Sequence, residues 1–202
     1  GEVLWTREHT APITAFNTSS SGTILGYADG NLSAIAPDGE QLFSFWPGGS
    51  EHEIVLGSAI TEDSSLIACV CGIDRQRFIV ARRMSNQYRI VYHTYLEGNL
   101  RRQIYVTFDK TGRFVFFETA DGLGVFDSES LESVIIPITG KILTTGSCSD
   151  NELFIVLSQD EQGFSLTAIE QPDHIIGSKR FPGDNAFLIQ RDTVLYLGID
   201  DR

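Results

Sequence analysis

The chain has 202 residues, of which 42% are hydrophobic and 21% are charged, and this balance excludes intrinsic disorder over the whole chain. Its formal net charge of -12 argues against binding to nucleic acid, and none of its apolar runs is long enough to span a bilayer. The length suits a single all-β domain, and we expect one domain over residues 1–202.

Five segments along the chain share one pattern, a polar turn followed by a short strand that is apolar on both faces. Their first apolar residues are spaced by 42, 48, 39 and 41 positions. Apolar side chains on both faces are typical of a strand inside a packed sheet. A period of about forty residues with several short strands is typical of propellers. We therefore expect an all-β propeller of four-stranded antiparallel blades. The first apolar residues are Ile24, Leu66, Phe114, Leu153 and Val194.

Further strands are predicted on both sides of these five interior strands. A less regular strand precedes each one, at 13–17, 56–60, 104–108, 143–147 and 186–189. A third strand follows in the first four units at 32–36, 77–81, 123–126 and 164–169, and a more polar fourth at 42–46, 88–95, 131–138 and 175–181. Helical periodicity is not sustained over a helix length anywhere, so we expect helix content close to nil.

The two ends of the chain carry incomplete units. Residues 3–7 have the pattern of a fourth strand with no unit before it, and the last unit stops after two strands. In a closed propeller the N-terminal strand commonly completes the blade that the C-terminal strands begin, because this removes exposed sheet edges. We therefore expect four complete blades and a fifth built from both termini, or an arc of a larger propeller. In either case we expect a piece trimmed from a longer chain.

Two stretches, GEVLWTREHTAPI (1–13) and GYADGNLSAIAPDGEQLFSF (26–45), resemble the repeats of quinoprotein-like (PQQ-like) and WD40-like propellers. Gly1 and Trp5 match the glycine and the docking tryptophan of that pattern, and Ala-Pro at 11–12 matches the step into the next blade. The resemblance covers the whole chain in strand rhythm and two units in motif. It implies a propeller fold and favours an extracytoplasmic location. Because no calcium-site or quinone-stacking residue of the family can be matched here, we expect no cofactor.

An aspartate lies in the turn after each interior strand. If the strands are assigned correctly, these aspartates share one face of the disc, where they could form an acidic ring or hold a cation. Turn chemistry is the simpler interpretation, because Asp hydrogen-bonds its own backbone in tight turns. The alternative function, a propeller enzyme that processes sugars or a redox cofactor near the central channel, would use some of them. The aspartates are Asp29, Asp74, Asp121, Asp160 and Asp200.

The segment from Arg75 to Arg113 is basic within an acidic chain. It holds nine basic and two acidic residues, a net of +7, which leaves a net of -19 on the other residues. Clustered arginines suit contacts with carboxylates or phosphates. The simpler interpretation is an outer strand whose charges pair with acidic neighbours. We expect a non-catalytic module that binds another protein, acidic at the contact, and no membrane insertion by this segment. The candidate partner-binding residues are Arg77, Arg82, Arg83, Arg101 and Arg102.

Cysteines and outer aromatic residues are predicted to be structural. Cys69 and Cys71 lie two apart on one strand, which gives poor disulfide geometry, and no further ligands stand at metal-site spacing. We expect these two and Cys148 to be buried apolar side chains. Aromatic residues of the fourth strands could mark an interface, but packing between adjacent blades is the simpler interpretation. They are Phe45, Trp46, Tyr88, Tyr92 and Tyr95.

Overall fold

The computed structural model describes residues 3, 5–85, 87–147, 153–170, 172–191 and 194–200. Within these residues the chain forms antiparallel sheets and one short 3-10 helix, η1 (Gly49–Glu51), which confirms an all-β chain with almost no helix. The described ranges contain no helix long and apolar enough to cross a membrane. Two compact units are present, Gly1–Ala120 with Asp127–Leu131, and Asp121–Phe126 with Glu132–Arg202. One domain over the whole chain stays a prediction.

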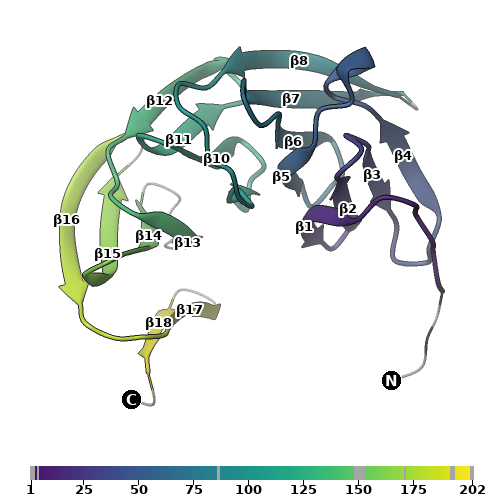
Figure 1. The fold of residues 1–202 in the computed structure, drawn as a ribbon. Helices are drawn as coiled ribbons and strands as arrows, with labels where there is room; N and C mark the ends of the chain where they lie inside the picture. Colours follow the sequence, from purple (N-terminus) through teal and green to yellow (C-terminus); the bar gives the residue numbers. More distant parts are fainter. Residues whose placement is uncertain are drawn as a thin grey trace. The chain divides into compact units, whose positions relative to one another are not determined.

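The strands of each sheet follow one another in chain order (Figure 1). Four sheets have four strands each, and the last sheet has two. The first sheet contains β1 (Ile13–Ser19), β2 (Gly22–Tyr27), β3 (Leu32–Ile35) and β4 (Gln41–Phe45), and the second contains β5 (Val55–Ile60), β6 (Leu66–Cys71), β7 (Arg77–Met84) and β8 (Gln87–Tyr95).

The third and fourth sheets repeat this arrangement, and four of the predicted interior strands are confirmed as β2, β6, β10 and β14. The fifth forms at its predicted place as β18, in a sheet of two strands among the described residues. The third sheet contains β9 (Val106–Phe108), β10 (Phe114–Thr119), β11 (Gly122–Asp127) and β12 (Glu132–Ile136). The fourth contains β13 (Lys141–Ser147), β14 (Leu153–Asp160), β15 (Gly163–Glu170) and β16 (His174–Phe181), and the last contains β17 (Ala186–Arg191) and β18 (Val194–Ile199).

The core of the first unit lies between the faces of its sheets. Every residue of β5 and of β6 is buried, as expected of strands that carry apolar side chains on both faces. One cluster joins the first and second sheets and includes Ile24, Leu32 and Ile79. On the other side of the second sheet, the fully buried rings of Phe78 and Phe117 stack with centroids 3.9 Å apart. Packing of this kind fixes the sheet that carries Arg77, Arg82, Arg83 and Arg89.

Strand β8 is the outer edge of the second sheet, and it differs from the interior strands in two ways. None of its nine residues, from Gln87 to Tyr95, is fully buried. Its register with β7 shifts between Val80 and Ala81, so that one residue of β8 is left without a counterpart. The register on the hairpin side of this shift places Arg82 opposite Arg89.

Short turns between the strands are held by aspartates. Asp29 Oδ1 accepts a hydrogen bond from the amide of Asn31 at 3.0 Å, and Asp160 Oδ1 accepts one from Gln162 at 2.8 Å. Gly30 follows Asp29 with a φ of +83°, and a Cβ there would lie 2.6 Å from the backbone of His52. A larger residue at position 30 would therefore be strained and would clash.

The N-terminal segment differs from its prediction as a strand of the last sheet. The described residues 3 and 5–7 lie outside any strand, and the last sheet has β17 and β18 alone among the described residues. Trp5 Nε1 donates to the carbonyl of Pro37 at 3.0 Å, and Arg7 Nη1 donates to the carbonyl of Gly39 at 3.3 Å. Because these side chains bond the β3–β4 turn, the segment docks on the first sheet. The expected fifth blade from both termini is not formed by these residues.

The second unit contains the β17–β18 hairpin. One face of this hairpin packs against β13, and the other face is exposed. A Cβ on Gly146 of β13 would lie 2.7 Å from Leu195, so this face of the hairpin is in close contact with β13. On the opposite face Phe187, Ile189 and Tyr196 are about half exposed, at 53%, 46% and 53%. An open groove of about 640 Å³ is lined by Phe181, Pro182, Gly183, Leu197, Ile199 and Asp200.

Candidate functional site

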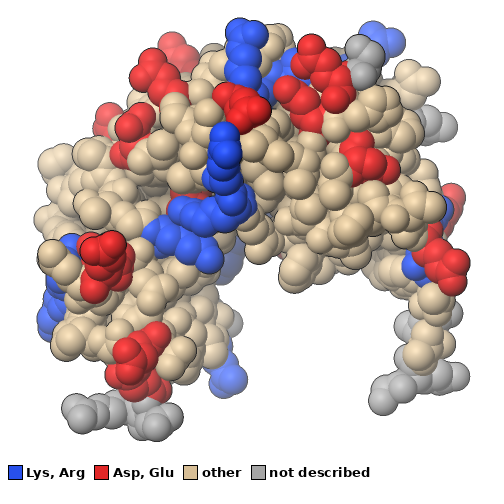
Figure 2. Space-filling model, viewed as in Figure 1, with Lys and Arg blue, Asp and Glu red and all other residues tan. Residues whose placement is uncertain are grey.

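The five predicted partner-binding arginines lie around the two ends of β7. Arg77 begins the strand and Arg82 comes five positions later, a separation of about 16 Å in an extended strand. Figure 2 shows basic side chains with acidic side chains beside them on the visible face. The structure therefore brings these arginines together as two groups. We call Arg77, Arg101 and Arg102 the Asp74-end arginines, and the other end of the strand contains Arg82 and Arg83.

Arg102 is bound to a buried carboxylate. Its Nη1 lies 2.6 Å from Glu118 Oε2 and its Nη2 lies 2.8 Å from Glu118 Oε1. The Glu118 side chain is 2% exposed, whereas that of Arg102 is 36% exposed. Hydrogen bonding to Glu118 raises the pKa of Arg102, against the opposing effect of burial. A bidentate pair at a buried carboxylate is structural, because loss of the arginine would remove two charge-assisted hydrogen bonds from the buried Glu118.

The other two Asp74-end arginines also have partners. Arg77 Nη2 donates to the carbonyl of Pro47, and Arg101 Nη2 lies 2.9 Å from Asp74 Oδ1 in a pair that is mostly exposed. The side chain of the buried Gln76 donates to the carbonyl of Leu100 at 2.7 Å and accepts from its amide at 3.0 Å. These contacts tie the loop after β8 to the turn before β7, and they engage the arginines on the protein itself.

The hairpin end of the second sheet differs from the Asp74 end in the partners of its arginines. Arg82, Arg83 and Arg89 are exposed, and none of them forms an ion pair within the described part of the chain. Arg82 Nη2 donates to the carbonyl of Ser128 at 3.2 Å, and Arg83 Nε donates to the carbonyl of Ser85 at 3.3 Å. Each bond occupies one of five guanidinium donors. We call Arg82, Arg83 and Arg89 the arginine hairpin.

Arg89 was not among the predicted site residues, although cross-strand register identifies it. With β7 ending at Met84 and β8 beginning at Gln87, the two-residue connection sets Arg82 opposite Arg89 and Arg83 opposite Tyr88. Residues directly opposite in an antiparallel pair share a face of the sheet. Arg82 and Arg89 therefore share one face, and Arg83 lies on the other. Like charges directly opposite each other destabilise a sheet, so the pairing of Arg82 with Arg89 does not serve the stability of the fold.

Comparison with known proteins identifies the fold family. The chain matches the model of a family described as beta-propeller protein over residues 1–202. The chain belongs to the β-propeller family. Each of its four-stranded sheets is accordingly a blade of the propeller type. The resemblance to quinoprotein-like repeats stays a prediction.

The chain is similar to a protein of Treponema pallidum (strain Nichols) named "Uncharacterized protein". The two are 42% identical over 200 residues, which cover 99% of this chain and 53% of that protein, so the chain spans about half the length of this relative. It is also similar in fold to the solved structures of RRP9 WD40 repeats and U3-55K. Their TM-scores are 0.63 and 0.62 at 16% identity, with 88% and 89% of this chain and 53% and 54% of those chains covered. At this identity the likeness shows the fold alone.

Four of the five turn aspartates bind other residues through their carboxylates, two of them within their own turns. Asp29 and Asp160 accept amide hydrogen bonds as described, Asp74 pairs with Arg101, and Asp200 Oδ1 accepts from Asp184 and Asn185 at 2.9 and 3.0 Å. Asp121 is exposed in the β10–β11 turn. The acidic ring remains a prediction, because Asp29 and Asp74 belong to one unit and Asp121, Asp160 and Asp200 to the other. The described residues hold no cluster of three or more metal-ligating side chains.

Asp29 lies in a small polar cluster of the first blade. His9 Nε2 is 3.2 Å from Asp29 Oδ2, and the His9 ring lies 3.8 Å from the ring of the buried Tyr27. Burial opposes the charged form, but the Asn31 amide and His9 together hold the pKa of Asp29 below its ordinary value. This arrangement fastens the loop before β1 to the β2–β3 turn.

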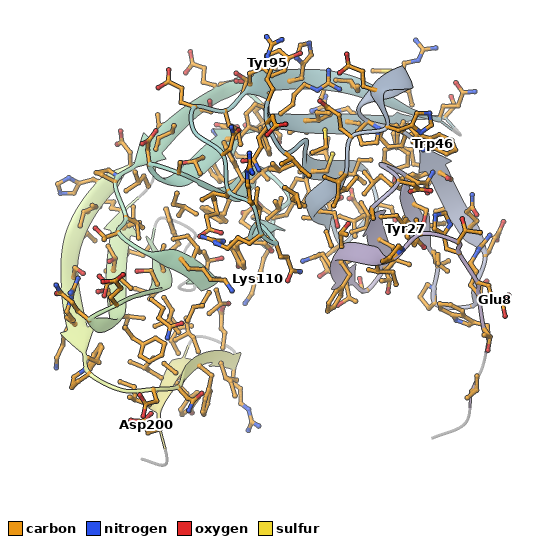
Figure 3. The ribbon with its side chains drawn as sticks, viewed as in Figure 1. Glu8, Tyr27, Trp46, Tyr95, Lys110 and Asp200 are labelled. Carbon is orange, nitrogen blue, oxygen red and sulfur yellow. The ribbon has the colours of Figure 1, made fainter. Side chains whose placement is uncertain are left out.

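The aromatic residues of the fourth strands divide into packed and exposed groups. Tyr88 packs on Phe43 of the neighbouring blade at 4.4 Å, which confirms packing between blades at this position. Trp46 and Tyr95 are 44% and 45% exposed, and Figure 3 shows their side chains well apart at the ends of β4 and β8. The guanidinium of Arg75 lies 3.7 Å from the centre of the Tyr95 ring.

Cys69 and Cys71 are free and buried, as predicted. Burial, with the nearby Glu53 carboxylate, raises the pKa of Cys71 to about 12, and burial raises the pKa of Cys69. Because a thiolate is the reactive form, neither cysteine is poised for chemistry at neutral pH. The prediction for Cys148 lies outside the described residues.

Proposed function

We propose that the chain is a non-catalytic interaction module that binds a protein partner through the arginine hairpin of its second blade. The observation that carries this proposal is a set of exposed arginines without carboxylate partners, within the described residues, on a chain of net charge -12. The WD40-like fold supports it, because propellers present loops and outer strands from a rigid scaffold.

The hairpin has the composition of a binding surface. Arginine, methionine and tyrosine are enriched at protein interfaces. Met84 and Ile90 are both 46% exposed beside the arginines, and Tyr88 lies half-buried opposite Arg83. An exposed apolar side chain between cations fits a partner that combines carboxylates with apolar residues. The local positive charge of the hairpin favours an acidic protein surface as that partner.

The Asp74-end arginines support the proposal by contrast. Because Arg102 binds Glu118 and Arg101 binds Asp74, most of the charge at that end is compensated within the protein. The alternative of a sugar- or redox-processing enzyme receives no comparable support, because the carboxylates of Asp29 and Asp160 bond the amides of their own turns.

The proposed function is tested by capture of partners on the immobilised chain from an extract of the source organism. The variant Arg82→Gln/Arg83→Gln/Arg89→Gln removes the hairpin charges, and Arg101→Gln is the matched control, an exposed arginine that already has a partner. We expect a specific captured protein that is lost with the triple variant, retained with the control, and released by raised salt. A partner captured equally by all three proteins would contradict the proposal.

A further inference from the structure

We infer that Arg82 and Arg89, together with Met84, form a clamp for a side-chain carboxylate in an acidic, partly apolar segment of a partner protein. This inference rests on the proposed function and names the chemistry of its site. It treats the three arginines of the hairpin as unequal. Arg82 and Arg89 hold the carboxylate directly, whereas Arg83 contributes only to the general positive charge.

The register of the hairpin sets the backbone positions of the two arginines directly opposite each other. Arg82 and Arg89 are Cα partners across β7 and β8. Directly opposite residues of an antiparallel pair have Cα atoms about 4.5 to 5.5 Å apart and share a face. Two planar donor groups rooted so close together can place several N–H groups around one carboxylate. The bound anion would also offset the repulsion between the two arginines.

The face that carries the clamp is identified by alternation along β7. Residues two apart share a face, so Arg82 lies on the same face as Val80 and Phe78. Phe78 stacks on Phe117 of β10, and Arg82 donates to the carbonyl of Ser128. The amide of Ser128 is itself bonded to the carbonyl of Arg113 at 2.9 Å. The clamp is therefore held on one side by a fixed backbone acceptor, while the remaining donors of Arg82 stay available.

Two carboxylates lie next to Ser128, the residue that Arg82 contacts. Asp127 and Glu129 flank Ser128 in sequence, and both lie within salt-bridge distance of Arg113, at 2.7 and 3.3 Å. Two carboxylates share one guanidinium there, so negative charge remains close to Arg82. A dianionic phosphate is repelled by this charge more strongly than a single carboxylate is. The proposed partner is an acidic protein segment, and a phosphorylated segment is the alternative that the experiment tests.

Met84 gives the clamp an apolar neighbour. It lies two residues after Arg82, hence on the same face, and its side chain is 46% exposed. A leucine or similar side chain next to the bound carboxylate would cover it. Arg83 faces the other way, opposite Tyr88, whose hydroxyl donates to the carbonyl of Ser64. Arg83 is therefore a matched control, equal to Arg82 in charge and adjacent in sequence, but on the opposite face.

The experiment measures binding of short fluorescein-labelled peptides by fluorescence anisotropy. The first peptide alternates Glu with Leu, the second replaces Glu by Gln, and the third replaces Glu by phosphoserine. Each is titrated with the unmodified protein and with Arg82→Gln, Arg89→Gln, the double variant Arg82→Gln/Arg89→Gln, Arg83→Gln and Met84→Ser. We expect binding of the Glu peptide to weaken about tenfold in either clamp variant and less than about twofold in Arg83→Gln.

The double variant provides a second criterion. If both arginines hold one carboxylate, the loss in Arg82→Gln/Arg89→Gln is smaller than the product of the two single losses, because the second substitution removes an interaction already broken. We expect Met84→Ser to weaken binding of the peptide that alternates Glu with Leu. Binding of a further peptide, in which Ser replaces Leu, should not change. Unchanged circular dichroism of each variant confirms that the comparison is made between folded proteins.

Three outcomes would overturn the inference. Equal weakening by Arg83→Gln and Arg82→Gln would show diffuse attraction without a clamp. Tighter binding of the phosphoserine peptide would overturn the choice of carboxylate. Absence of Glu-peptide binding, with protein capture still dependent on the hairpin, would overturn the clamp and leave the proposed function intact. By contrast, capture that is indifferent to all three hairpin arginines would overturn the proposed function itself.

Discussion

The two ends of β7 carry the same residue type in opposite situations. At the Asp74 end, arginines bind Glu118, Asp74 and the carbonyl of Pro47. At the hairpin end, the arginines are exposed and meet only backbone carbonyls, with no ion pair among the described residues. Both groups come from one basic stretch of sequence. The comparison teaches that a run of like charges on a strand cannot be treated as one surface until the partners of each charge are known.

The arginines at the two ends of β7 also differ in how much they contribute to the free energy of unfolding. An arginine bound to a buried carboxylate contributes to folding through the carboxylate that it compensates. An exposed arginine without a partner contributes little to folding and can be substituted freely unless something binds it. Stability measurements and binding measurements should therefore respond to different arginines.

The largest effect is expected from Arg102→Ala at the Asp74 end. It leaves the carboxylate of Glu118, which is 2% exposed, without its two guanidinium hydrogen bonds. We expect the free energy of unfolding to fall by about 3 kcal/mol, measured by urea denaturation at neutral pH. The double variant Arg102→Met/Glu118→Leu should recover part of this loss, since it removes both charges. A loss no greater than that of Arg101→Ala would mean that the pair is not structural.

A smaller effect on stability is expected at acid pH, through Asp127. This residue precedes Ser128, whose carbonyl accepts a hydrogen bond from Arg82. The side-chain hydrogen bond from Arg113, against opposing burial and with help from the Glu129 amide, holds the pKa of Asp127 below its ordinary value of 3.8. A carboxyl group whose pKa is lower in the folded state contributes stability that is fully present above its unfolded pKa. This stability is lost as pH falls through the folded pKa. In Asp127→Asn we expect lower stability at neutral pH and a shallower loss below about pH 4. An unchanged acid profile in urea midpoints would contradict this assignment.

Arg101→Ala should change stability very little. Its pair with Asp74 is exposed, with side chains 73% and 85% accessible. Pairs of this kind contribute about 0.5 kcal/mol or less, and salt screens them. Thermal denaturation at low and high salt measures the difference directly. A larger, salt-independent loss would show that the loop after β8 depends on this contact as well as on Gln76.

The smallest stability effect is expected from the hairpin triple variant Arg82→Gln/Arg83→Gln/Arg89→Gln. Because no carboxylate is left unpaired and the Arg82–Arg89 repulsion is removed, the free energy of unfolding should stay within about 0.5 kcal/mol of the unmodified protein. The same variant should lose its partner. A loss of stability as large as that of Arg102→Ala would erase the distinction between the two ends of β7.

The fold could be predicted because its signals are local. Interior strands such as Leu66–Cys71 are apolar on both faces, and Asp-Gly turns such as Asp29-Gly30 set the hairpins. The position of the N-terminal segment could not be predicted, because it depends on a tertiary contact. Trp5 binds the carbonyl of Pro37 in the β3–β4 turn. The candidate site was predicted in residue type and region only. The separation of Arg77 from Arg82, and the addition of Arg89, required the register of β7 with β8.

The register shift at Val80 and Ala81 has a consequence for behaviour at high concentration. It lies on β8, the outer edge of its blade, where an unpaired row of backbone groups would otherwise template the addition of a strand from another molecule. A bulge twists such an edge, and the adjacent Arg89 adds a charge to it. The irregularity that aligns Arg82 with Arg89 thus also guards the longest outer strand described against edge-to-edge aggregation.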